Sequence, residues 1–586
     1  MDLLYQSDVG DDIDHSRDDL LTDFAKSVLR DRYIYNNESY QELFMRVAKY
    51  YGDDVEHSAR LYDYMSKLWF MPATPILSNG GTSRGLPISC FLNEAEDSLD
   101  GIVNLWNENV WLAAKGGGIG SYWGNLRSIG SRVRGSGKTS GIIPFIVVQN
   151  ALTLAISQGS LRRGSSAVFL PVSHPEIEEF IGIRRPMGGD PNRKALNIHH
   201  GVVISDDFMR AVEKGEQWSL ISPEDNKVRV TLGARSLWIK ILTARMDTGE
   251  PYILFIDNVK NSLPLTYDKL GLDVKTTNLC TEIVLSTGKD HIGYDRSAVC
   301  CLSSLNLEYY DQWSDNELFV EDIMRFLDNV LEDFIVKSPA KMSKAKYSAM
   351  RERSIGLGVM GFYSLLQKKM IPFESVTAKT LNRKIFKQIK QQADECSKRL
   401  AQERGACLDA EEIHLQERFT HKLAIAPTAS ISIITGSSPG IDPLLANIFT
   451  HKTLTGSFSV KNKYLVSLLQ SKGQDKKEVW KSILSNYCSV QHLSFLTDYE
   501  KSVFKTAYEI DQRWIIEHAA DRTEFICQSQ SLNIFLPSTV TKRELHNLHY
   551  TAWKKKIKSL YYLRSLSIAR PDDITGQDES ECLSCQ

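Results

Sequence analysis

The stretch from Thr277 to Glu282 places an amide, a thiol and a carboxylic acid at every second position, in the side chains of Asn278, Cys280 and Glu282. In an extended segment alternate side chains point to the same face, so we expect these three to project together into one pocket. They would offer it a hydrogen-bonding amide, a sulfur atom and a proton acceptor. Because cysteine is often simply a small buried residue, this stretch indicates chemistry only if other parts of the chain support it.

Further cysteines could exchange electrons with a substrate. Cys90 and Cys300 each lie in an apolar, strand-like run, and cysteines on neighbouring strands can approach to about 5.5 Å between Cα atoms, which is disulfide range. The C-terminal tail adds the pair Cys582 and Cys585. A tethered dithiol and two strand cysteines suggest thiol–disulfide exchange, in which the tail reduces an internal disulfide and is then reduced externally. Zinc binding by the tail pair and simple core packing of the strand cysteines are the alternatives.

Motifs for metal binding are incomplete in this sequence. The Glu-x-x-His motif from Glu411 to His414 lacks the second copy that a carboxylate-bridged pair of metals needs. His546 and His549 lie one helical turn apart without an accompanying cysteine or acid motif. We therefore expect no catalytic metal and no covalent cofactor in this chain.

The residues that could do chemistry lie in a chain whose hydrophobic pattern changes along its length. Residues 1–72 show the helical spacing of apolar side chains. Residues 73–437 alternate short apolar runs with longer helical patterns, which indicates an α/β domain. Residues 438–565 have a mostly helical pattern, and residues 566–586 are too poor in apolar side chains to pack.

Composition excludes several classes of protein. The 586 residues are 42% hydrophobic and 24% charged, within the ordinary range of globular proteins. With 70 basic and 72 acidic residues the net charge is -2, which gives no general electrostatic reason to bind nucleic acid or an anionic membrane. The acidic N-terminus is unlike a signal peptide, and the sequence has no uninterrupted apolar run of about 18 residues. These features predict a cytoplasmic protein with reduced cysteines.

Five separated stretches of this chain resemble the large catalytic subunit of class I ribonucleotide reductase, and they occur in the same order as in that family. With the tail cysteines, the resemblance runs from about Thr74 to Cys585. It implies a ten-stranded α/β barrel with a central finger loop, preceded by the helical N-terminal region. The stretches are Thr74–Ile76 with Ser89–Cys90, Ser157–Gly164, Asn278–Glu282, Pro427–Ser432 and Tyr561–Tyr562.

The resemblance also implies roles for the central residues. Cys280 would be a thiyl radical on the finger loop that takes the 3'-hydrogen of a ribonucleotide. Glu282 would accept the proton of the 3'-hydroxyl group and Asn278 would hold that hydroxyl, a task that suits a carboxylate within hydrogen-bond reach. Cys90 and Cys300 would supply two electrons and become a disulfide.

Cys301 is an additional cysteine that the family pattern does not require. It directly follows Cys300, so either residue could be the partner of Cys90. The count back from Asn306 favours Cys300, and an exchange of the two roles stays open.

The substrate implied by the resemblance is a ribonucleoside diphosphate. A loop that leads into a helix offers hydroxyl and backbone N–H groups that can hold a diphosphate, although such a stretch can equally be a plain Ser/Thr-rich helix cap. Thr74 and Ser89 would assist nearby. The loop residues are Pro427, Thr428, Ala429, Ser430 and Ile431.

Tyr561 and Tyr562 distinguish between sources of the radical. In the class I enzymes that this chain resembles, such a pair relays the radical from a separate, metal-containing small subunit. A cobalamin-dependent reductase would not need it and is the second candidate; a non-catalytic nucleotide-binding regulatory homologue is the third. The resemblance further implies that thioredoxin or glutaredoxin reduces Cys582 and Cys585 in the tail.

Regulation is implied by three further residues. Asp97, Arg134 and Arg162 lie in stretches that resemble the site where a deoxynucleotide or ATP effector, with Mg²⁺, selects the base to be reduced at a homodimer interface. Only the segment from Met1 to Arg17 precedes the first helical pattern. We therefore expect no N-terminal ATP cone and no activity-regulating nucleotide site in this chain.

Overall fold

The computed structural model describes residues 13–133, 135, 137–158, 162–453, 456–537 and 539–565. Within these ranges, the side chains of residues 157–158, 162–163, 451–453 and 456–458 are not described.

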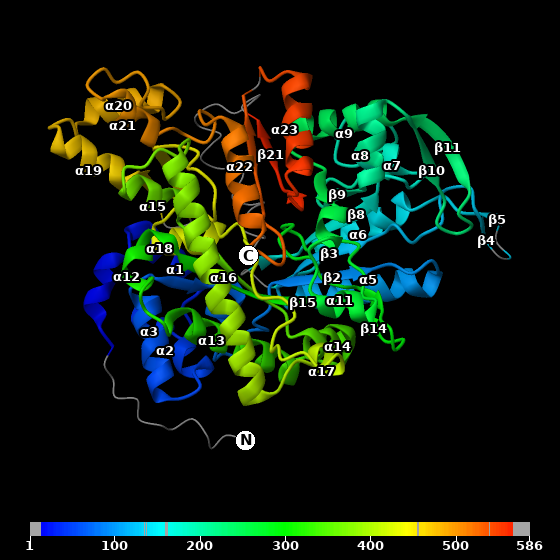
Figure 1. The fold of residues 1–586 in the computed structure, drawn as a ribbon, viewed down its shortest axis with the longest axis horizontal. Helices are drawn as coiled ribbons and strands as arrows, with labels where there is room; N and C mark the ends of the chain where they lie inside the picture. Colours follow the sequence, from blue (N-terminus) through cyan, green and yellow to red (C-terminus); the bar gives the residue numbers. More distant parts are fainter. Residues whose placement is uncertain are drawn as a thin grey trace.

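A group of helices forms the N-terminal region, as the sequence predicts (Figure 1). Three of them begin at a polar residue, Thr22, Ser39 or Asp54, whose side chain accepts a hydrogen bond from a backbone N–H group of the first turn. Their apolar faces are buried against the remainder of the protein. The elements are η1 (His15–Leu20), α1 (Asp23–Arg32), α2 (Tyr40–Tyr51) and α3 (Val55–Ser66).

The first half of the barrel is a row of parallel strands. Each is paired with the next along the chain, and helices cover the outer side of the sheet (Figure 1). Both faces of these strands are buried, which explains their continuous apolar runs. The strands are β2 (Cys90–Glu94), β3 (Gly118–Tyr122), β8 (Ser165–Pro171), β9 (His199–Ile204) and β12 (Tyr252–Phe255).

The second half returns to close the ring. β15 (Ala298–Asn306) runs antiparallel to β2 and parallel to β16 (Ile355–Met360). Bridges from Leu357 to Leu423 and from Ile425 to Gln530 continue the pairing through two extended segments. The Tyr561 N–H group then bonds the Leu532 carbonyl, and β20 (Ser559–Leu560) pairs antiparallel with β12. The ring thus passes through β2, β3, β8, β9, β12, β20, 528–532, 422–425, β16 and β15, which is the expected ten-stranded barrel.

The ring does not end at residue 437. Segment 528–532 and strand β20 are both members of it, although the sequence assigns residues 438–565 to a separate, mostly helical part. In the sequence, a small lobe with its own apolar cluster lies between residue 437 and segment 528–532. Figure 1 shows this lobe at upper left. Its elements are β17 (Ile448–Thr453), β18 (Gly456–Lys461), α19 (Lys463–Ser471), α20 (Lys477–Ser485) and α21 (Asp498–Val503).

The other elements surround the ring. β1 (Phe70–Pro72) pairs with β15, and the remaining short strands form two-stranded ribbons. These strands are β4 (Arg132–Val133), β5 (Gly137–Lys138), β6 (Ser157–Gln158), β7 (Arg162–Arg163), β10 (Gln217–Ile221), β11 (Val228–Gly233), β13 (Gly288–Lys289), β14 (Asp295–Arg296), β19 (Ile534–Leu536) and β21 (Leu563–Ser565). The longer helices are α5 (Leu99–Ala114), α6 (Ile143–Ala155), α8 (Asp206–Lys214), α9 (Ala234–Thr248), α13 (Phe319–Lys337), α14 (Ser343–Glu352), α16 (Val376–Arg404), α22 (Gln512–Thr523) and α23 (Lys542–Lys554). The shorter ones are α4 (Thr74–Asn79), α7 (Ile177–Ile181), η2 (Pro191–Arg193), α10 (Ile256–Lys260), α11 (Leu265–Leu270), η3 (Leu307–Tyr309), α12 (Tyr310–Trp313), η4 (Ala340–Met342), α15 (Phe362–Lys368), α17 (Leu408–Glu412) and α18 (Ala429–Thr435).

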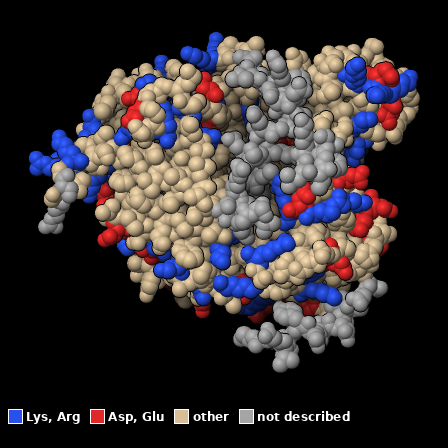
Figure 2. Space-filling model, turned by 180° about the vertical axis from the view of Figure 1, so that it is seen from behind, with Lys and Arg blue, Asp and Glu red and all other residues tan. Residues whose placement is uncertain are grey.

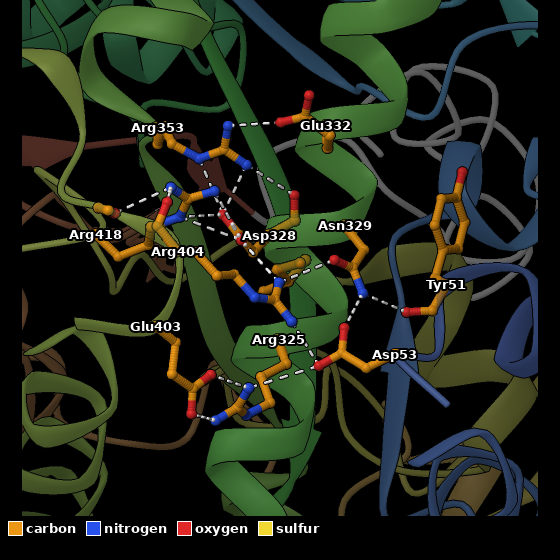
Figure 3. Close-up of polar contacts among 12 residues, drawn as sticks. Tyr51, Asp53, Arg325, Asp328, Asn329, Glu332, Arg353, Glu403, Arg404 and Arg418 are labelled. Atoms are coloured by element: carbon orange, nitrogen blue, oxygen red, sulfur yellow. Dashed lines mark hydrogen bonds and ion pairs between the residues drawn. The ribbon is translucent and has the colours of Figure 1, made fainter. Parts of the chain in front are cut away.

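A buried cluster of charges joins the N-terminal helices to the barrel (Figure 3). Asp328 of α13 accepts hydrogen bonds from the guanidinium groups of Arg353, Arg404 and Arg418, which lie on three different segments. Its neighbour Asn329 donates to Asp53, in the connection between α2 and α3. Because Asp328 is only 1% exposed, its charge needs these partners, and they hold α13 in place behind β15.

The surface carries no extended field of one charge on the face that Figure 2 shows. Basic and acidic side chains are interspersed there, in keeping with the net charge of -2. Among the described helices, none is both long and apolar enough to span a membrane.

Candidate active site

The loop that carries Asn278, Cys280 and Glu282 is a turn and not the extended segment that the sequence suggests. The Thr281 N–H group bonds the Asn278 carbonyl at 3.3 Å, and Thr281 has a left-handed backbone with φ of 68°. The Asn278 side-chain oxygen accepts the Ile283 N–H group at 3.1 Å and so closes the turn. A turn brings side chains together by chain reversal, and here it directs Asn278 and Glu282 to the same thiol, that of Cys90.

The barrel wall holds this loop in its interior. A Cβ atom on Gly120 of β3 would lie 1.7 Å from the Thr277 carbonyl oxygen, so only glycine allows the loop to pass so close. On the other side, the Ser529 N–H group donates to the Glu282 carbonyl at 2.8 Å. The Ser531 hydroxyl donates to the Cys280 carbonyl at 2.5 Å.

The side chains of Asn278 and Glu282 both point toward Cys90 of β2. Asn278 Nδ2 lies 3.2 Å from Cys90 Sγ, and Cys90 Sγ lies 3.9 Å from Glu282 Oε1. Ser531 donates to the other Glu282 oxygen at 3.2 Å. Burial raises the pKa of Glu282 to about 7, against the opposing effect of hydrogen bonds from Asn278 and Ser531. A carboxyl group with this pKa can both accept and release a proton near neutral pH.

Cys90 and Cys300 lie directly opposite each other on the antiparallel strands β2 and β15. Both are buried free thiols, and the Gln528 amide donates to Cys300 Sγ at 3.5 Å. Burial, together with the adjacent thiols of Cys301 and Cys90, raises the pKa of Cys300 well above its usual value. Paired positions on neighbouring strands have Cβ atoms about 4.5–5.5 Å apart, so a small adjustment brings these two sulfur atoms to bonding distance.

Cys301 faces away from this pair. Its sulfur donates to the Leu327 carbonyl of α13 at 3.5 Å, on the outer side of the barrel. Successive residues of a strand point to opposite faces, so only one of the two adjacent cysteines can face Cys90.

The loop predicted to hold a diphosphate leads into a helix, as expected. Thr428 has a left-handed backbone with φ of 57°, and α18 begins at Ala429. The Thr428 hydroxyl accepts the Gly440 N–H group at 2.6 Å, which fixes the approach to the helix. The first turn that follows, with Ser430 and Ile431, has backbone N–H groups without acceptors in the helix itself, which suits an anionic group.

The hydrogen bonds that the structure describes for Thr74 and Ser89 are with residues outside this loop. Thr74 begins α4, and its hydroxyl is 2.8 Å from the hydroxyl of Tyr33, the residue after α1. Ser89 is 2% exposed and directly precedes Cys90, whose sulfur donates to its hydroxyl at 3.6 Å.

Tyr561 and Tyr562 pack against each other with their rings tilted by 51°. Their ring centroids are 4.2 Å apart, and both side chains belong to the buried cluster that contains Leu279 and Cys280. Tyr252 of β12 packs against both rings, at 4.8 and 5.2 Å between centroids. The tyrosine pair is therefore connected to the finger loop through tightly packed side chains.

A polar group at the outer tyrosine was not predicted from the sequence. The Tyr562 hydroxyl lies 3.4 Å from His199 Nδ1, which is 2.6 Å from Glu250 Oε1. Burial would raise the pKa of Glu250, but its interactions with His199 and Arg184 outweigh that effect and hold the pKa well below its usual value. The adjacent histidines 199 and 200, in an otherwise apolar strand, are the signal that could have revealed this group.

Other residues that hold the finger loop were also missed. Gln528, Ser529 and Ser531 contact Val284, Glu282 and Cys280 from the facing wall of the barrel. Their sequence signal is the alternation of Gln and Ser from 528 to 531, directly before an apolar strand.

The predicted effector residues are not brought together by the described part of the chain. Asp97 forms an ion pair with Arg127 at 3.0 Å. Arg134 lies outside the described residues, and Arg162 is described in its backbone only, as part of β7. The tail cysteines Cys582 and Cys585 also lie outside the described residues. Among the residues that are described, no group of three His, Cys, Asp or Glu side chains could hold a metal ion.

Comparison with known proteins gives one consistent result. Residues 19–85 match the family model "Ribonucleotide reductase, all-alpha domain", and residues 88–417 and 415–563 match "Ribonucleotide reductase, barrel domain". The chain is 43% identical to the putative ribonucleoside-diphosphate reductase large subunit of Frog virus 3, over 92% of this chain and 94% of that protein. It is 38% identical to the corresponding subunit of Invertebrate iridescent virus 3, over 98% and 99%.

Solved structures agree with the sequence relatives. The alpha subunit of the class Id ribonucleotide reductase of Actinobacillus ureae superposes with a TM-score of 0.82. That comparison covers 97% of this chain and 99% of the other at 33% identity.

Proposed function

The chain belongs to the ribonucleotide reductase large-subunit family and is a catalytic subunit that reduces ribonucleotides, and on this basis we propose that Cys280 is its radical residue. The observation that carries the proposal is the convergence of Asn278, Glu282 and the Cys90 thiol on the finger loop inside a closed barrel. A radical needs such an enclosure, because oxygen and stray reductants would otherwise consume it.

In the proposed reaction each of these side chains has one defined chemical role. A thiyl radical at Cys280 takes the 3'-hydrogen of the ribose, while Glu282 accepts the 3'-hydroxyl proton and Asn278 holds that hydroxyl group. The 2'-hydroxyl leaves as water, and Cys90 and Cys300 supply two electrons and two protons as they become a disulfide. Cys280 then returns the hydrogen atom to the 3'-carbon, and Glu282 returns the proton to the 3'-oxygen. The pKa of Glu282, about 7, supports its role as a general base.

The substrate is a ribonucleoside diphosphate whose phosphates bind at the start of α18. The left-handed Thr428 and the first turn of the helix support this assignment, because they turn backbone N–H groups toward one point. Thr74 and Ser89 contribute hydroxyl groups beside the same end of the barrel. Pro427, Thr428, Ala429, Ser430 and Ile431 form the loop.

The radical comes from a metal-containing small subunit and enters through Tyr562 and Tyr561. Their 4.2 Å ring contact, and their packing against the finger loop, support a relay over a short distance. A partly apolar groove of about 640 Å³ between α9 and α23 supports a docking place for that subunit. Both helices of the groove are connected to the tyrosine pair. The carbonyl of Gly249, directly after α9, accepts the Leu563 N–H group, and α23 is followed by β20, which directly precedes Tyr561.

Reduction and regulation complete the proposal. Cys582 and Cys585 return electrons to the internal disulfide and are themselves reduced by thioredoxin or glutaredoxin. The protein is a homodimer that packs through α5 and α6, an interface supported by the exposed apolar side chains Leu99, Val103 and Leu154 on these helices. A deoxynucleotide or ATP effector with Mg²⁺ binds near that interface, at Asp97, Arg134 and Arg162.

Turnover assays test the proposal directly. The full chain should reduce ribonucleoside diphosphates only when a matching small subunit is present, and adenosylcobalamin should not replace that subunit. Replacing Cys280 by Ser should abolish reduction while nucleotide binding persists. Activity of Cys280→Ser, or activity with adenosylcobalamin alone, would contradict the proposal.

A further inference from the structure

A second cavity lies on the outside of the barrel, where segments 422–425 and 528–532 begin. It has a volume of about 580 Å³ and is not lined by any residue of the proposed active site. Two carboxylates, Asp394 and Glu524, face five basic residues around it. The basic residues are Lys390, Lys422, Lys555, Lys556 and Lys558. The excess of positive charge favours an anionic ligand.

The lysines differ in how far their charge is already balanced. Lys390 and Lys422 share Asp394, Lys422 also pairs with Glu417, and Lys555 pairs with Glu517. Lys556 is exposed and forms no ion pair with any described residue. At least part of the positive charge at the rim is therefore free to attract an anion.

Cys527 lines this cavity and differs from the other cysteines. Of the eight cysteines in the described part of the chain, seven are buried and Cys527 alone is partly exposed. Its sulfur accepts the backbone N–H groups of Lys422 and Leu423 at 3.2 and 3.3 Å. These bonds fix the sulfur at the wall of the cavity, where it also donates to the Leu423 carbonyl at 3.5 Å.

Lys558 adds a buried positive charge next to this sulfur. The residue is 3% exposed, and its Nζ donates to the carbonyls of Ile526, Cys527 and Gln528. No carboxylate of the described residues pairs with it, and burial lowers its pKa to about 8. Because a buried cation without a counter-ion is costly, an anionic sulfur at Cys527 would stabilise Lys558 as well.

Asn258 supplies an independent sign that the cavity accepts a ligand. It is 3% exposed and lines the cavity, and its Nδ2 donates to the carbonyls of Trp553 and Ile557. Its Oδ1 has no hydrogen-bond partner among the described residues. A buried, unpaired amide oxygen is costly, so it favours a ligand that brings an N–H donor.

We propose that Cys527 is a site of covalent modification by anionic, peptide-like disulfides, which the surrounding lysines attract and Asn258 helps to bind. The Cys527 sulfur attacks one sulfur of the disulfide, whose S–S bond breaks as a new mixed S–S bond forms. The other half leaves as a thiolate and takes up the proton that Cys527 has lost. Cys527 is thus oxidised, and the departing half is reduced by the same electron pair.

The modification has a direct structural route to the finger loop. The residue after Cys527 is Gln528, whose amide bonds Cys300 Sγ at 3.5 Å and accepts the Val284 N–H group at 3.2 Å. Ser529 follows and donates to the Glu282 carbonyl. An adduct that displaces residue 527 therefore disturbs the redox pair and the general base, and we expect lower turnover. This second step rests on the proposed function, whereas formation of the adduct does not.

Oxidised glutathione is the probe for the chemical step. The folded full-length protein is incubated with it, quenched with acid, and mapped by peptide mass spectrometry. We expect Cys527 to acquire the glutathionyl group at least about 10-fold faster than any of the seven buried cysteines. Lys556→Gln should slow modification of Cys527 several-fold at low salt, while the same change at a lysine far from the cavity, Lys49→Gln, should not.

Two matched variants separate modification from its consequence. Cys527→Ser removes the partly exposed thiol, and Cys488→Ser removes a buried one that lies in the separate small lobe. The comparison uses chains in which Cys582 and Cys585 are both replaced by Ser, because an oxidised tail would itself pass its disulfide to Cys90 and Cys300. After glutathione treatment of this background, single-turnover reduction without external reductant should fall several-fold with or without Cys488→Ser, but not when Cys527→Ser is added. An unmodified Cys527 in folded protein that reacts readily after denaturation would overturn the proposal. Equal inhibition of Cys527→Ser would overturn the link to the finger loop.

Discussion

Glu282 illustrates how position alone changes the chemistry of an ordinary side chain. An exposed glutamate loses its proton at a pH of about 4.3, whereas burial raises the pKa of this one to about 7. The hydrogen bonds from Asn278 and Ser531 favour the charged form but only partly offset the burial. The residue is thereby poised to exchange a proton in the range where the enzyme works.

The proposed role of Glu282 predicts a specific pH dependence. The carboxylate is the form that accepts a proton, so turnover should rise with pH through about 7 and level off above it. Glu282→Gln should lower kcat about 100- to 10,000-fold and remove this inflection, because the amide does not titrate. The measurement is kcat against pH for both proteins, with nucleotide binding as the control. An unchanged inflection in Glu282→Gln would assign it to another group.

The adjacent cysteines of β15 allow a matched comparison. Cys300 faces Cys90, and Cys301 faces the Leu327 carbonyl on the opposite side of the strand. We expect Cys300→Ser to abolish multiple turnover and Cys301→Ser to keep activity within about twofold of the native level, as a near-isosteric change in a core. Steady-state assays with a dithiol reductant check both. The reverse pattern would identify Cys301 as the redox partner.

At the scale of elements, one of the two buried acids of helix α13 joins the helix to three other segments. Asp328 is surrounded by Arg353, Arg404 and Arg418 (Figure 3). Burial by itself would raise the pKa of Asp328, but the charges of Arg353 and Arg418 outweigh it and hold the pKa below the usual value. A depressed pKa means that this group stabilises the fold above the pKa of the unfolded chain, about 3.9, and that the contribution is lost as the pH falls further.

Removal of that carboxylate should be among the most damaging changes outside the active site. Asp328→Ala leaves three arginines around an empty position, and we expect a loss of about 3–5 kcal/mol in the free energy of unfolding. Glu332→Gln is the control, because that side chain is 53% exposed and its pairing with Arg353 should contribute no more than about 1 kcal/mol. Denaturant unfolding at neutral pH measures both. Similar losses in the two variants would contradict the central role of Asp328.

At the scale of the whole molecule, the outer surface determines which partners can assemble. The groove between α9 and α23 is lined by the half-exposed Ile239, by Met246 and by the buried side chains of Trp238 and Leu242. Exposed apolar side chains on α5 and α6 form a second surface, away from that groove. The two surfaces suit two partners, a small subunit at the groove and a second copy of this chain at the helices.

One substitution in each surface separates the two assemblies. Ile239→Glu puts a charge at the exposed wall of the groove and should weaken binding of the small subunit at least about 10-fold, while the protein remains dimeric. Leu154→Glu on α6 should favour the monomer and leave small-subunit binding by each chain intact. Sedimentation and titration with the small subunit measure the two effects. Loss of both assemblies in either variant would show that the surfaces are not independent.

The sequence by itself was sufficient for the family, the helical N-terminal region and the α/β character of the barrel, because these depend on local patterns and on short motifs in a set order. Asn278, Cys280 and Glu282 could be picked out in the same way, since all three lie within five consecutive residues. The extended geometry assigned to them was wrong. The spacing of the three residues is compatible with a strand and also with a turn. Only the contacts with neighbouring segments distinguish the two conformations.

Only the tertiary structure decided which distant residues meet. Cys300 faces Cys90 because of the register between β2 and β15, and a shift by one residue would have turned Cys301 inward instead. Gln528 and Ser531 reach the finger loop from more than 240 positions away, and Lys558 and Cys527 meet because the ring closes through β20. Such contacts depend on the closure of the barrel, a long-range event that is not encoded in the spacing of any one motif.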